Sequence, residues 1–547
     1  MKERRKSRGF LLGAVVVSCC LAVAAHGAES RKAKSAGRPS VRTSQACISC
    51  HADNKISPVT GAKIVQEWRR GAHAKKSAAA CPDCHKPNNH PNGGSIVGNP
   101  EDAVCTECHA TTDPKLRSHF VSYPVGYTKG APARKTVPPS GDVATYQSAV
   151  YVAAEDPSPC RLCHNPHDNS SVIQVNRDWA ASGHADREAL PFTKYRFKTQ
   201  GEGVCSRCHT STGFIYYVTT GSTIPVKGIK NNAINEVLGC KTCHVSYSWK
   251  RRSLKAVSAA YVATTAGSKP DVVAYPDAGE SNLCLNCHVG RQSGDTIKGL
   301  PATVDFANTG FENSHYLTAG GTLFAQTGYE FSGRDYTKAG TITHTGIGIT
   351  APGTRMGKGP CVECHMSNAN NHHFQPVARD GTGRIVRVLS TVCRSCHTGP
   401  LAATTEFLNQ RKEGFEAALA VQKAQLAKKG FFFLEALPYF FKSGDSADPK
   451  TNAVRNWVSA GDGSEKGRAT GEKNMGAAFN YNLLKHDPGA FAHNWRYTRE
   501  LIYDSIDWLD DNSLNDSVGA ALDALAAGGA VSADVKAKAQ AYLVPRP

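Results

Sequence analysis

The sequence predicts a mainly α-helical fold with extensive loops, in which side chains supply only part of the core. The chain has 547 residues, of which 50 are glycine, 28 are proline and only 40% are hydrophobic. Such a composition interrupts long regular elements. A Cys-x-x-Cys-His motif occurs nine times between residues 47 and 397 with no fixed period, which argues against a strict repeat array. Beyond residue 400 the motif is absent, and apolar residues recur at helical spacing.

Each motif carries the chemistry that attaches haem c. Its two thiols add to the two vinyl groups of one haem, and the adjoining histidine becomes the proximal ligand of the iron. Zinc sites need four ligands, a thioredoxin-like site occurs once per domain, and a disulfide framework would require haem to be absent. The sequence therefore predicts nine covalent haems, held by Cys47, Cys50 and His51; by Cys81, Cys84 and His85; by Cys105, Cys108 and His109; by Cys160, Cys163 and His164; by Cys205, Cys208 and His209; by Cys240, Cys243 and His244; by Cys284, Cys287 and His288; by Cys361, Cys364 and His365; and by Cys393, Cys396 and His397.

The motifs are too closely spaced for separate small domains. Residues 47–397 span 351 positions, which leaves 39 for each of the nine motifs. We therefore expect residues 46–400 to form one wrap of short helices and loops around nine haems that pack against one another. Eighteen of the 20 cysteines belong to motifs, so no structural disulfide is expected.

The N-terminal residues predict export. Residues 1–28 read as a secretion signal, with a basic start, an apolar run and a small-x-small cleavage site. An alternative reading takes Val16-Val17-Ser18-Cys19 as a lipobox, which would make the chain a lipoprotein anchored through Cys19. Either way we expect a periplasmic, outer-membrane-associated or extracellular protein. Residues 29–45 are polar and basic and predict a flexible tether.

Each iron needs a second ligand, and histidine is the expected one. Histidine is abundant outside the motifs, whereas the three methionines beyond the leader are Met356, Met366 and Met475. Low-potential haems with two histidine ligands are therefore expected. His486 has the weakest case among the eleven histidines available, and one of the adjacent pair His372 and His373 should bind. The expected second ligands come from His73, His90, His119, His167, His184, His315, His344, His372, His373 and His493.

Residues 401–547 form the predicted haem-free helical region. One apolar face ends at Gly430, a second helix is expected over 494–511, and a third near 532–543. The segment contains no recognisable enzyme motif and reads as a helical cap. The residues that define the first two faces are Leu408, Phe415, Leu419 and Leu426, then Trp495, Thr498, Ile502, Ile506 and Leu509.

The motifs resemble those of the large multihaem c-type cytochromes of dissimilatory metal-reducing bacteria. Two Trp-x4-His-Ala frames, Trp68 to Ala74 and Trp179 to Ala185, and the segment 361–366 add to the likeness. The tail segment 479–494 is distantly similar to helices of pentahaem nitrite reductases and octahaem hydroxylamine oxidoreductases. The chain has no Cys-x-x-Cys-Lys, which the nitrite reductases use.

The expected function is electron transfer through a chain of haems in anaerobic or extracellular respiration. The resemblance implies redox partner proteins, namely other cytochromes or quinol-oxidising membrane complexes, with self-assembly or an outer-membrane conduit as further options. The alternative is a terminal reductase with one open-coordinate haem, acting on nitrite, hydroxylamine, a sulfur oxyanion or a metal oxide. Nucleic acid is not an expected partner. The formal charge is +18, but no binding motif accompanies it, and haem propionates would offset it.

Overall fold

The structure is a computed structural model, and it describes seven of the nine motifs. The third motif (Cys105, Cys108 and His109) and the fourth (Cys160, Cys163 and His164) lie outside the described residues. The predicted signal, Cys19, most of the tether, His119 and Met356 also lie outside them. The described residues are 41–56, 62–75, 79–90, 92–97, 104, 167, 175, 178–179, 181–186, 204–222, 238–245, 250–265, 267–337, 344–349, 357–367, 371–458 and 467–547.

Short helices dominate the described part of the chain before residue 400, as predicted. Three 3-10 turns join them, η2 (Gly279–Ser281), η3 (His344–Gly346) and η4 (Gly399–Leu401). The helices are α1 (Val41–His51), α2 (Ile64–Arg70), α3 (Ala72–Lys75), α4 (Cys81–His85), α11 (Ser206–His209), α12 (Ser211–Thr220), α13 (Cys240–Cys243), α14 (Asn282–His288), α15 (Gly294–Lys298), α16 (Ala319–Leu323), α17 (Gly359–His365) and α18 (Thr391–Cys396).

Strands are few in the described residues and form three two-stranded antiparallel sheets. The pairs are β1 (Ser258–Tyr261) with β2 (Asp271–Ala274), β3 (Val377–Arg379) with β4 (Ile385–Val388), and β5 (Phe432–Phe433) with β6 (Phe440–Phe441). The mainly α fold class is thus confirmed. Between His288 and the start of α17 at Gly359, the described residues form α15, α16 and η3 joined by loops.

The tail contains longer helices. They are α19 (Thr405–Lys428), α20 (Arg468–Lys485), α21 (Ala490–His493), α22 (Trp495–Asp511), α23 (Val518–Ala527) and α24 (Ala533–Leu543). Side chains cap the starts of α19 and α22: the Thr404 hydroxyl accepts from the Phe407 amide at 3.1 Å, and the Asn494 side-chain oxygen Oδ1 accepts from the Tyr497 amide at 3.2 Å. The predicted stop at Gly430 is confirmed, because this glycine has φ +82° just after α19.

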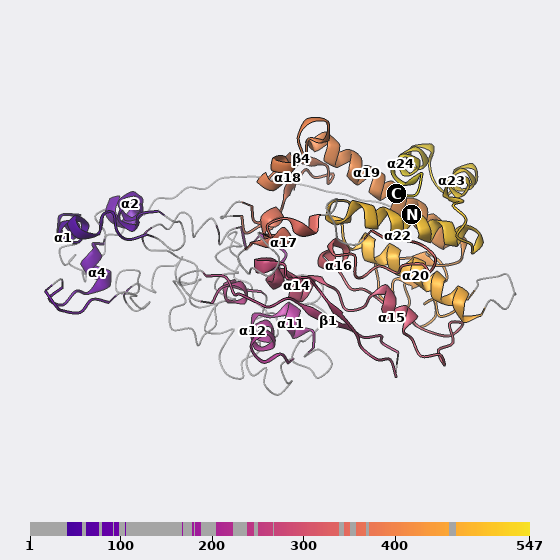
Figure 1. The fold of residues 1–547 in the computed structure, drawn as a ribbon, viewed down its shortest axis with the longest axis horizontal. Coiled ribbons are helices and arrows are strands. Elements are labelled where there is room, and N and C mark those ends of the chain that lie inside the picture. The colour runs from indigo at the N-terminus through magenta and orange to yellow at the C-terminus, as the bar shows by residue number, and fades with distance from the viewer. Residues whose placement is uncertain are drawn as a thin grey trace, which may run out of the picture.

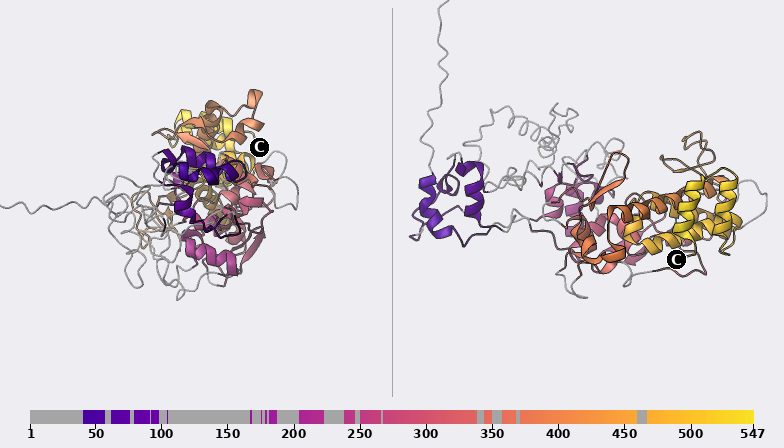
Figure 2. Two further views of the ribbon diagram at one scale, coloured as in Figure 1. Left: turned by 90° about the vertical axis from the view of Figure 1, so that its left-hand side faces the viewer. Right: turned by 90° about the horizontal axis from the view of Figure 1, so that it is seen from above.

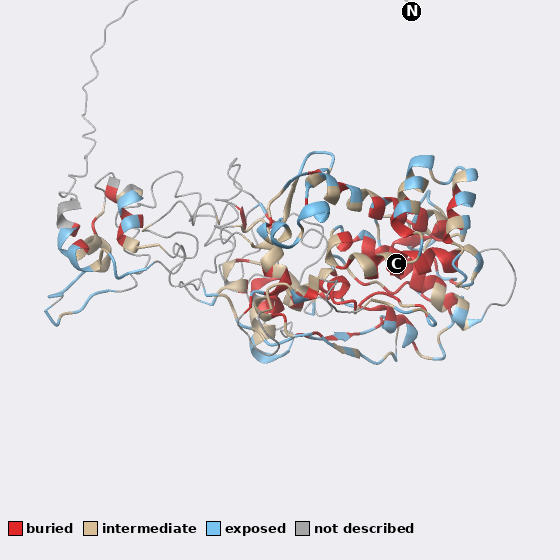
Figure 3. Ribbon diagram, turned by 45° about the horizontal axis from the view of Figure 1, so that its top comes forward, coloured by how far each residue is buried: buried red, intermediate tan, exposed pale blue. Residues whose placement is uncertain are grey.

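The elements are arranged along an elongated molecule. Figure 1 shows α1, α2 and α4 at one end and α20, α22, α23 and α24 at the other, with α11, α14 and α17 between them. The two further views in Figure 2 agree with this arrangement. Buried residues concentrate in the C-terminal half, where the tail helices pack on the segments that precede them (Figure 3).

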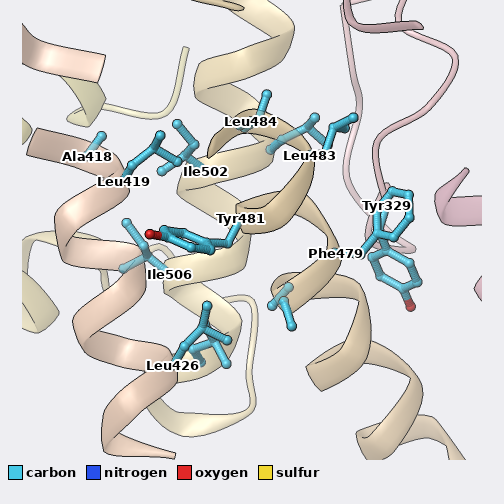
Figure 4. Close-up of a cluster of buried hydrophobic side chains, with 14 of the residues drawn as sticks. Tyr329, Ala418, Leu419, Leu426, Phe479, Tyr481, Leu483, Leu484, Ile502 and Ile506 are labelled. Atoms are coloured by element: carbon cyan, nitrogen blue, oxygen red, sulfur yellow. The ribbon is translucent and has the colours of Figure 1, made fainter. Parts of the chain in front are cut away.

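One apolar core spans residue 400. It contains Ile297 and Phe306 from before that residue, together with Leu419, Ile502 and Ile506 from the tail. Figure 4 shows side chains of α19, α20 and α22 turned toward one another in this core. Burying each large aliphatic side chain contributes about 1.5–3 kcal/mol. The tail therefore packs as part of the preceding fold and does not close a core of its own.

Among the described residues, no helix combines the length and the apolar character needed to cross a bilayer.

Candidate haem-binding sites

The seven described motifs lie on short helices or at their ends. In α14 and α17 the two cysteines and the histidine occupy the last turns, and the helix ends at His288 or His365. Positions i, i+3 and i+4 share one face of a helix. Each motif therefore presents its two thiols and its imidazole on one side, as attachment of one haem requires.

None of the fourteen described motif cysteines is in a disulfide, and they differ in exposure. Cys50, in α1, is exposed, whereas Cys47 and both cysteines of α4, Cys81 and Cys84, are half-buried. Haem attachment stays a prediction for all nine motifs, and Cys108 and Cys163 belong to the two motifs that lie outside the described residues.

Some of the described motif cysteines lie beside cysteines of other motifs. Contact with Cys284 and burial raise the pKa of the Cys361 thiol, and contact with Cys208 and burial raise the pKa of Cys287. Cys208 also approaches the carbonyl oxygen of Asn286, with its sulfur 3.9 Å away. The motifs are thus close neighbours.

Naming each motif by the number of its first cysteine, most of these contacts join motifs that are consecutive in the chain, and the contact between the 205 and 284 motifs skips the 240 motif. The 284 motif, on α14, touches the 361 motif on one side and the 205 motif on the other. The charge of Cys243 also acts on Cys287, which places the 240 motif nearby. The 361 motif continues to the 393 motif, since Cys393 acts on the Cys364 thiol. At the N-terminal end, Cys47 lies beside Cys81.

Each of the seven described motif histidines faces a second histidine. The partner comes from outside the motif, and the ring centres of all seven pairs are 5.9–6.4 Å apart. The pairs are His51–His90 at 6.2 Å, His85–His167 at 6.0 Å, His209–His315 at 6.0 Å, His244–His372 at 6.4 Å, His288–His184 at 6.1 Å, His365–His493 at 6.2 Å and His397–His344 at 5.9 Å.

This separation fits a metal ion between two imidazoles. With metal–nitrogen bonds of about 2 Å on each side, two coordinated imidazole rings have centres about 6 Å apart. Because each pair also belongs to a motif with two thiols outside any disulfide, the residues present fit a covalently attached haem whose iron has two histidine ligands.

The planes of the paired rings fall into two groups. They are within 33° of parallel for the pairs of His51, His85, His244 and His365. They are 75–84° apart for the pairs of His209, His288 and His397. The ring orientation is set by the backbone and by the hydrogen bond that each imidazole makes through its other nitrogen.

Several rings are oriented through Nδ1 by a neutral oxygen. The carbonyl acceptors are Val97 for His85 at 2.8 Å, Leu317 for His288 at 3.0 Å, Phe374 for His365 at 2.7 Å and Ala492 for His344 at 2.6 Å. A proton on Nδ1 leaves Nε2 with a free lone pair, which a metal ion needs. His493 differs, because its Nδ1 bonds to the buried Asp487 carboxylate at 3.0 Å.

Burial favours the neutral form of several of these imidazoles. It lowers the pKa of His167, His184, His315 and His365 to about 4 in each case. A neutral imidazole is the form that binds metal. Burial also lowers the pKa of His493, but the Asp487 charge outweighs this effect, so the net shift is upward.

Three histidines in the described part of the chain contact groups other than a motif histidine. His373 contacts Asp178 at 2.8 Å, while its neighbour His372 faces His244. His486 contacts Glu435 at 3.2 Å and lies against the Tyr316 ring, with centres 4.1 Å apart. His73 lies in α3, close enough to His167 to lower the pKa of that residue.

The two Trp-x4-His-Ala frames share a local structure. Trp68 and Trp179 are both buried, as are Ala74 and Ala185. The indole of Trp179 donates to the Leu238 carbonyl at 2.9 Å. The buried tryptophan thus anchors the backbone that carries His73 or His184.

Sequence reasoning missed Asp487 and the carbonyl groups that orient the rings. Asp487 belongs to the tail segment 479–494 that carries the distant likeness described above, so a signal for it was present. The carbonyl acceptors leave no signal in the sequence, because every residue has one.

Comparisons with known proteins agree with this reading of the sites. The chain is 34% identical over 531 residues to C-type polyheme cytochrome OmcB of Geobacter sulfurreducens, covering 85% of this chain and 69% of OmcB. It is 40% identical over 404 residues to C-type polyheme cytochrome OmcC of the same species, covering 69% of this chain and 51% of OmcC. No protein-family model and no solved structure matches.

The expected resemblance to multihaem cytochromes is therefore confirmed. The match to OmcB covers most of both chains, and the free motif thiols and paired histidines suit the same cofactor. The chain belongs to the C-type polyheme cytochromes, which carry covalently bound haem c.

Proposed function

We infer that this cytochrome is an electron carrier with nine haems, each held by one motif and one further histidine. The observation that carries the inference is the set of seven histidine pairs with ring centres about 6 Å apart. Each haem supplies a reversible one-electron couple of its iron. A carrier needs both axial positions filled, whereas a reductase needs one open for its substrate.

The second ligands of the two remaining motifs follow by elimination. Of the eleven histidines outside the motifs and beyond the predicted signal, seven face a motif histidine, and His373 and His486 bond to carboxylates. This leaves His73 and His119 for the motifs of His109 and His164. Full ligation by histidine is therefore possible for all nine irons, which favours the carrier over the terminal reductase.

The polypeptide contributes position, orientation and burial. Short helices position the two thiols of each motif, and carbonyl acceptors fix the tautomer of several imidazole rings. Apolar side chains such as Ala185 and Leu285, both 0% exposed, exclude water. The thiol contacts between motifs support a run of haems in the order 205, 284, 361 and 393, with the 240 motif beside the 284 motif. Electron tunnelling falls steeply with distance, so closely spaced sites favour transfer along this run.

Export and partners are part of the proposal. The N-terminal signal supports delivery outside the cytoplasmic membrane, either as a free protein or as a lipoprotein through Cys19. Since the relatives are themselves polyheme cytochromes, we expect electron exchange with other cytochromes. Docking to a quinol-oxidising complex, an outer-membrane conduit or further copies is a narrower form of this proposal.

The spin state of the irons tests the function. The purified holoprotein should have an intact mass about nine haem masses, roughly 616 Da each, above that of the processed chain. Its oxidised form should show only low-spin signals in electron paramagnetic resonance and should not bind cyanide or nitrite. One stoichiometric high-spin iron that binds nitrite would overturn the carrier and establish the reductase.

A further inference from the structure

Asp487 occupies an unusual position behind one of the paired histidines. It lies in the turn after α20, is 1% exposed, and its carboxylate accepts from His493 Nδ1 at 3.0 Å. The Gly489 amide also donates to it, at 3.3 Å. His493 in turn faces His365 of the 361 motif across 6.2 Å. The carboxylate therefore sits on the side of the imidazole that faces away from the motif.

The His493 ring packs closely against the backbone at Gly489. A Cβ atom added at Gly489 would lie 2.8 Å from Cε1 and 3.1 Å from Nε2 of the His493 ring. Only a glycine leaves room for the ring in this place. The turn Asp487-Pro488-Gly489 thus supplies both the carboxylate and the space for the imidazole.

The Nδ1 partners described for the neighbouring pairs carry no similar charge. On the 284 motif His288 bonds to the Leu317 carbonyl, and beside the 393 motif His344 bonds to the Ala492 carbonyl. His365 itself bonds to the Phe374 carbonyl. These acceptors are neutral, so the 361 motif is the one of these three whose described Nδ1 partners include a carboxylate. The Asp487 charge also acts on His288 of the 284 motif, but without a direct hydrogen bond to that ring.

A buried carboxylate favours the oxidised iron. The ferric state carries one positive charge more than the ferrous state, and a nearby negative charge in a low-dielectric interior stabilises it. A hydrogen bond from Nδ1 to a carboxylate also makes the imidazole a stronger electron donor than a bond to a carbonyl does. Both effects lower the reduction potential of that iron.

The angle between the two imidazole planes also favours a lower reduction potential at this site. The His365 and His493 planes are 33° apart, whereas the pairs of His288 and His397 are 75° and 84° apart. When the planes are near parallel, both imidazoles donate to the same iron d orbital. That orbital holds the vacancy of the ferric state, so the shared donation stabilises the oxidised iron.

We propose that Asp487 makes the haem of the 361 motif the lowest-potential member of the run formed by the 284, 361 and 393 motifs. The proposal rests on the proposed ligation of that haem by His365 and His493. An electron crossing this run must pass an unfavourable middle step, so Asp487 sets the step that limits transfer between the two ends. Asp487 is a positioning and tuning residue, because it acts through His493.

The test compares two variants that each remove one carboxylate from a histidine. Asp487→Asn removes the charge behind His493, and Glu435→Gln removes the charge beside His486, which faces no motif histidine in the described part of the chain. Reduction is followed potentiometrically by optical and electron paramagnetic resonance spectra. Asp487→Asn should raise the reduction equilibrium constant of one low-potential haem about tenfold, which is 59 mV for a one-electron couple.

Controls separate tuning from damage. Both variants should keep nine attached haems by mass and remain low-spin. Asp487→Glu keeps the charge and should leave the low-potential component within a few-fold of the wild type. Should Asp487→Asn lose haem, Asp487→Ser also removes the charge and keeps an oxygen acceptor. A nine-haem, low-spin neutral variant whose reduction curve superimposes on the wild type would overturn the proposal, as would an equal shift in Glu435→Gln.

Failure of the proposed function would look different. It would show as a high-spin iron in the unaltered protein, whatever the behaviour of Asp487→Asn. A wholly low-spin protein with no shift in the variant would leave the carrier intact and reject only the role of Asp487.

Discussion

Adjacent histidines 372 and 373 give the sharpest test of the ligand assignment. The sequence predicts that one of the two binds iron. The structure turns His372 toward His244, with ring centres 6.4 Å apart, and turns His373 to Asp178 at 2.8 Å. His372→Ala therefore removes the proposed ligand, whereas His373→Ala, at the next residue, removes only the contact with Asp178.

The expected size of the effect follows from the number of sites. His372→Ala should leave one iron in nine without its second imidazole, so about 11% of the haem should become high-spin and able to bind cyanide. His373→Ala should stay fully low-spin. It removes one contact with the Asp178 carboxylate, and losing one such hydrogen bond costs about 0.5–1.5 kcal/mol of stability.

Quantitative electron paramagnetic resonance and cyanide titration of the oxidised proteins measure this difference. Intact mass must show nine haems in both variants, because the motif cysteines are unchanged. A high-spin signal in His373→Ala, or two variants that both remain low-spin, would contradict the assignment of His372 as the second ligand opposite His244.

Three further predictions concern the tail. Deletion of residues 401–547 removes His493 and the Ala492 carbonyl that orients His344. The remaining chain should therefore show at least one high-spin iron by electron paramagnetic resonance, and a fully low-spin truncated protein would contradict the pairing of His365 with His493. Ile506→Ala, at a site 0% exposed, should lower the free energy of unfolding in guanidinium by about 2–5 kcal/mol. Leu401→Ala, at a site 58% exposed, should change it by about 0.5 kcal/mol or less. Equal losses in the two variants would mean that Ile506 does not lie in the core. Burial lowers the pKa of His486 despite the opposing charge of Glu435. As pH falls through about 6.5, the unfolded state therefore takes up a proton before the folded state does, and the stability of the fold decreases. The change in unfolding temperature between pH 7.5 and 5.5 should be smaller in His486→Gln than in the wild type, and an equal change would show that His486 does not have a lowered pKa.

The attachment chemistry could be predicted because it is local. Two cysteines and a histidine at i, i+3 and i+4 share one helix face regardless of what surrounds them, and each motif therefore identifies its own cofactor. The tail helices α19, α22 and α24 were predictable for the same reason, whereas no bounds were predicted for α20, α21 and α23. The apolar periodicity of the three predicted helices, the residues Asn494 and Ser532 at the starts of two of them, and the stop at Gly430 all lie within the segments themselves.

Composition also indicated that histidine would supply the second ligands, but it could not pair them. The partners are distant in sequence: 39 residues separate His51 from His90, and 128 separate His365 from His493. Which segments meet depends on how the whole chain packs, and local preference contains no information about that. The choice of His372 over His373 was open for the same reason.

Tertiary structure alone decided the environment of each site. The core that spans residue 400 includes Ala490 and Phe491 of α21, and this helix places His493 opposite His365 of α17 with the Asp487 carboxylate behind it. The contacts between Cys284 and Cys361 and between Cys208 and Cys287 likewise arise only on folding. The sequence by itself determined what each motif binds, because that chemistry is covalent and local. The order of the sites in space and the charge around each iron were decided by long-range packing, since charges and dipoles act through distances that only the folded chain defines.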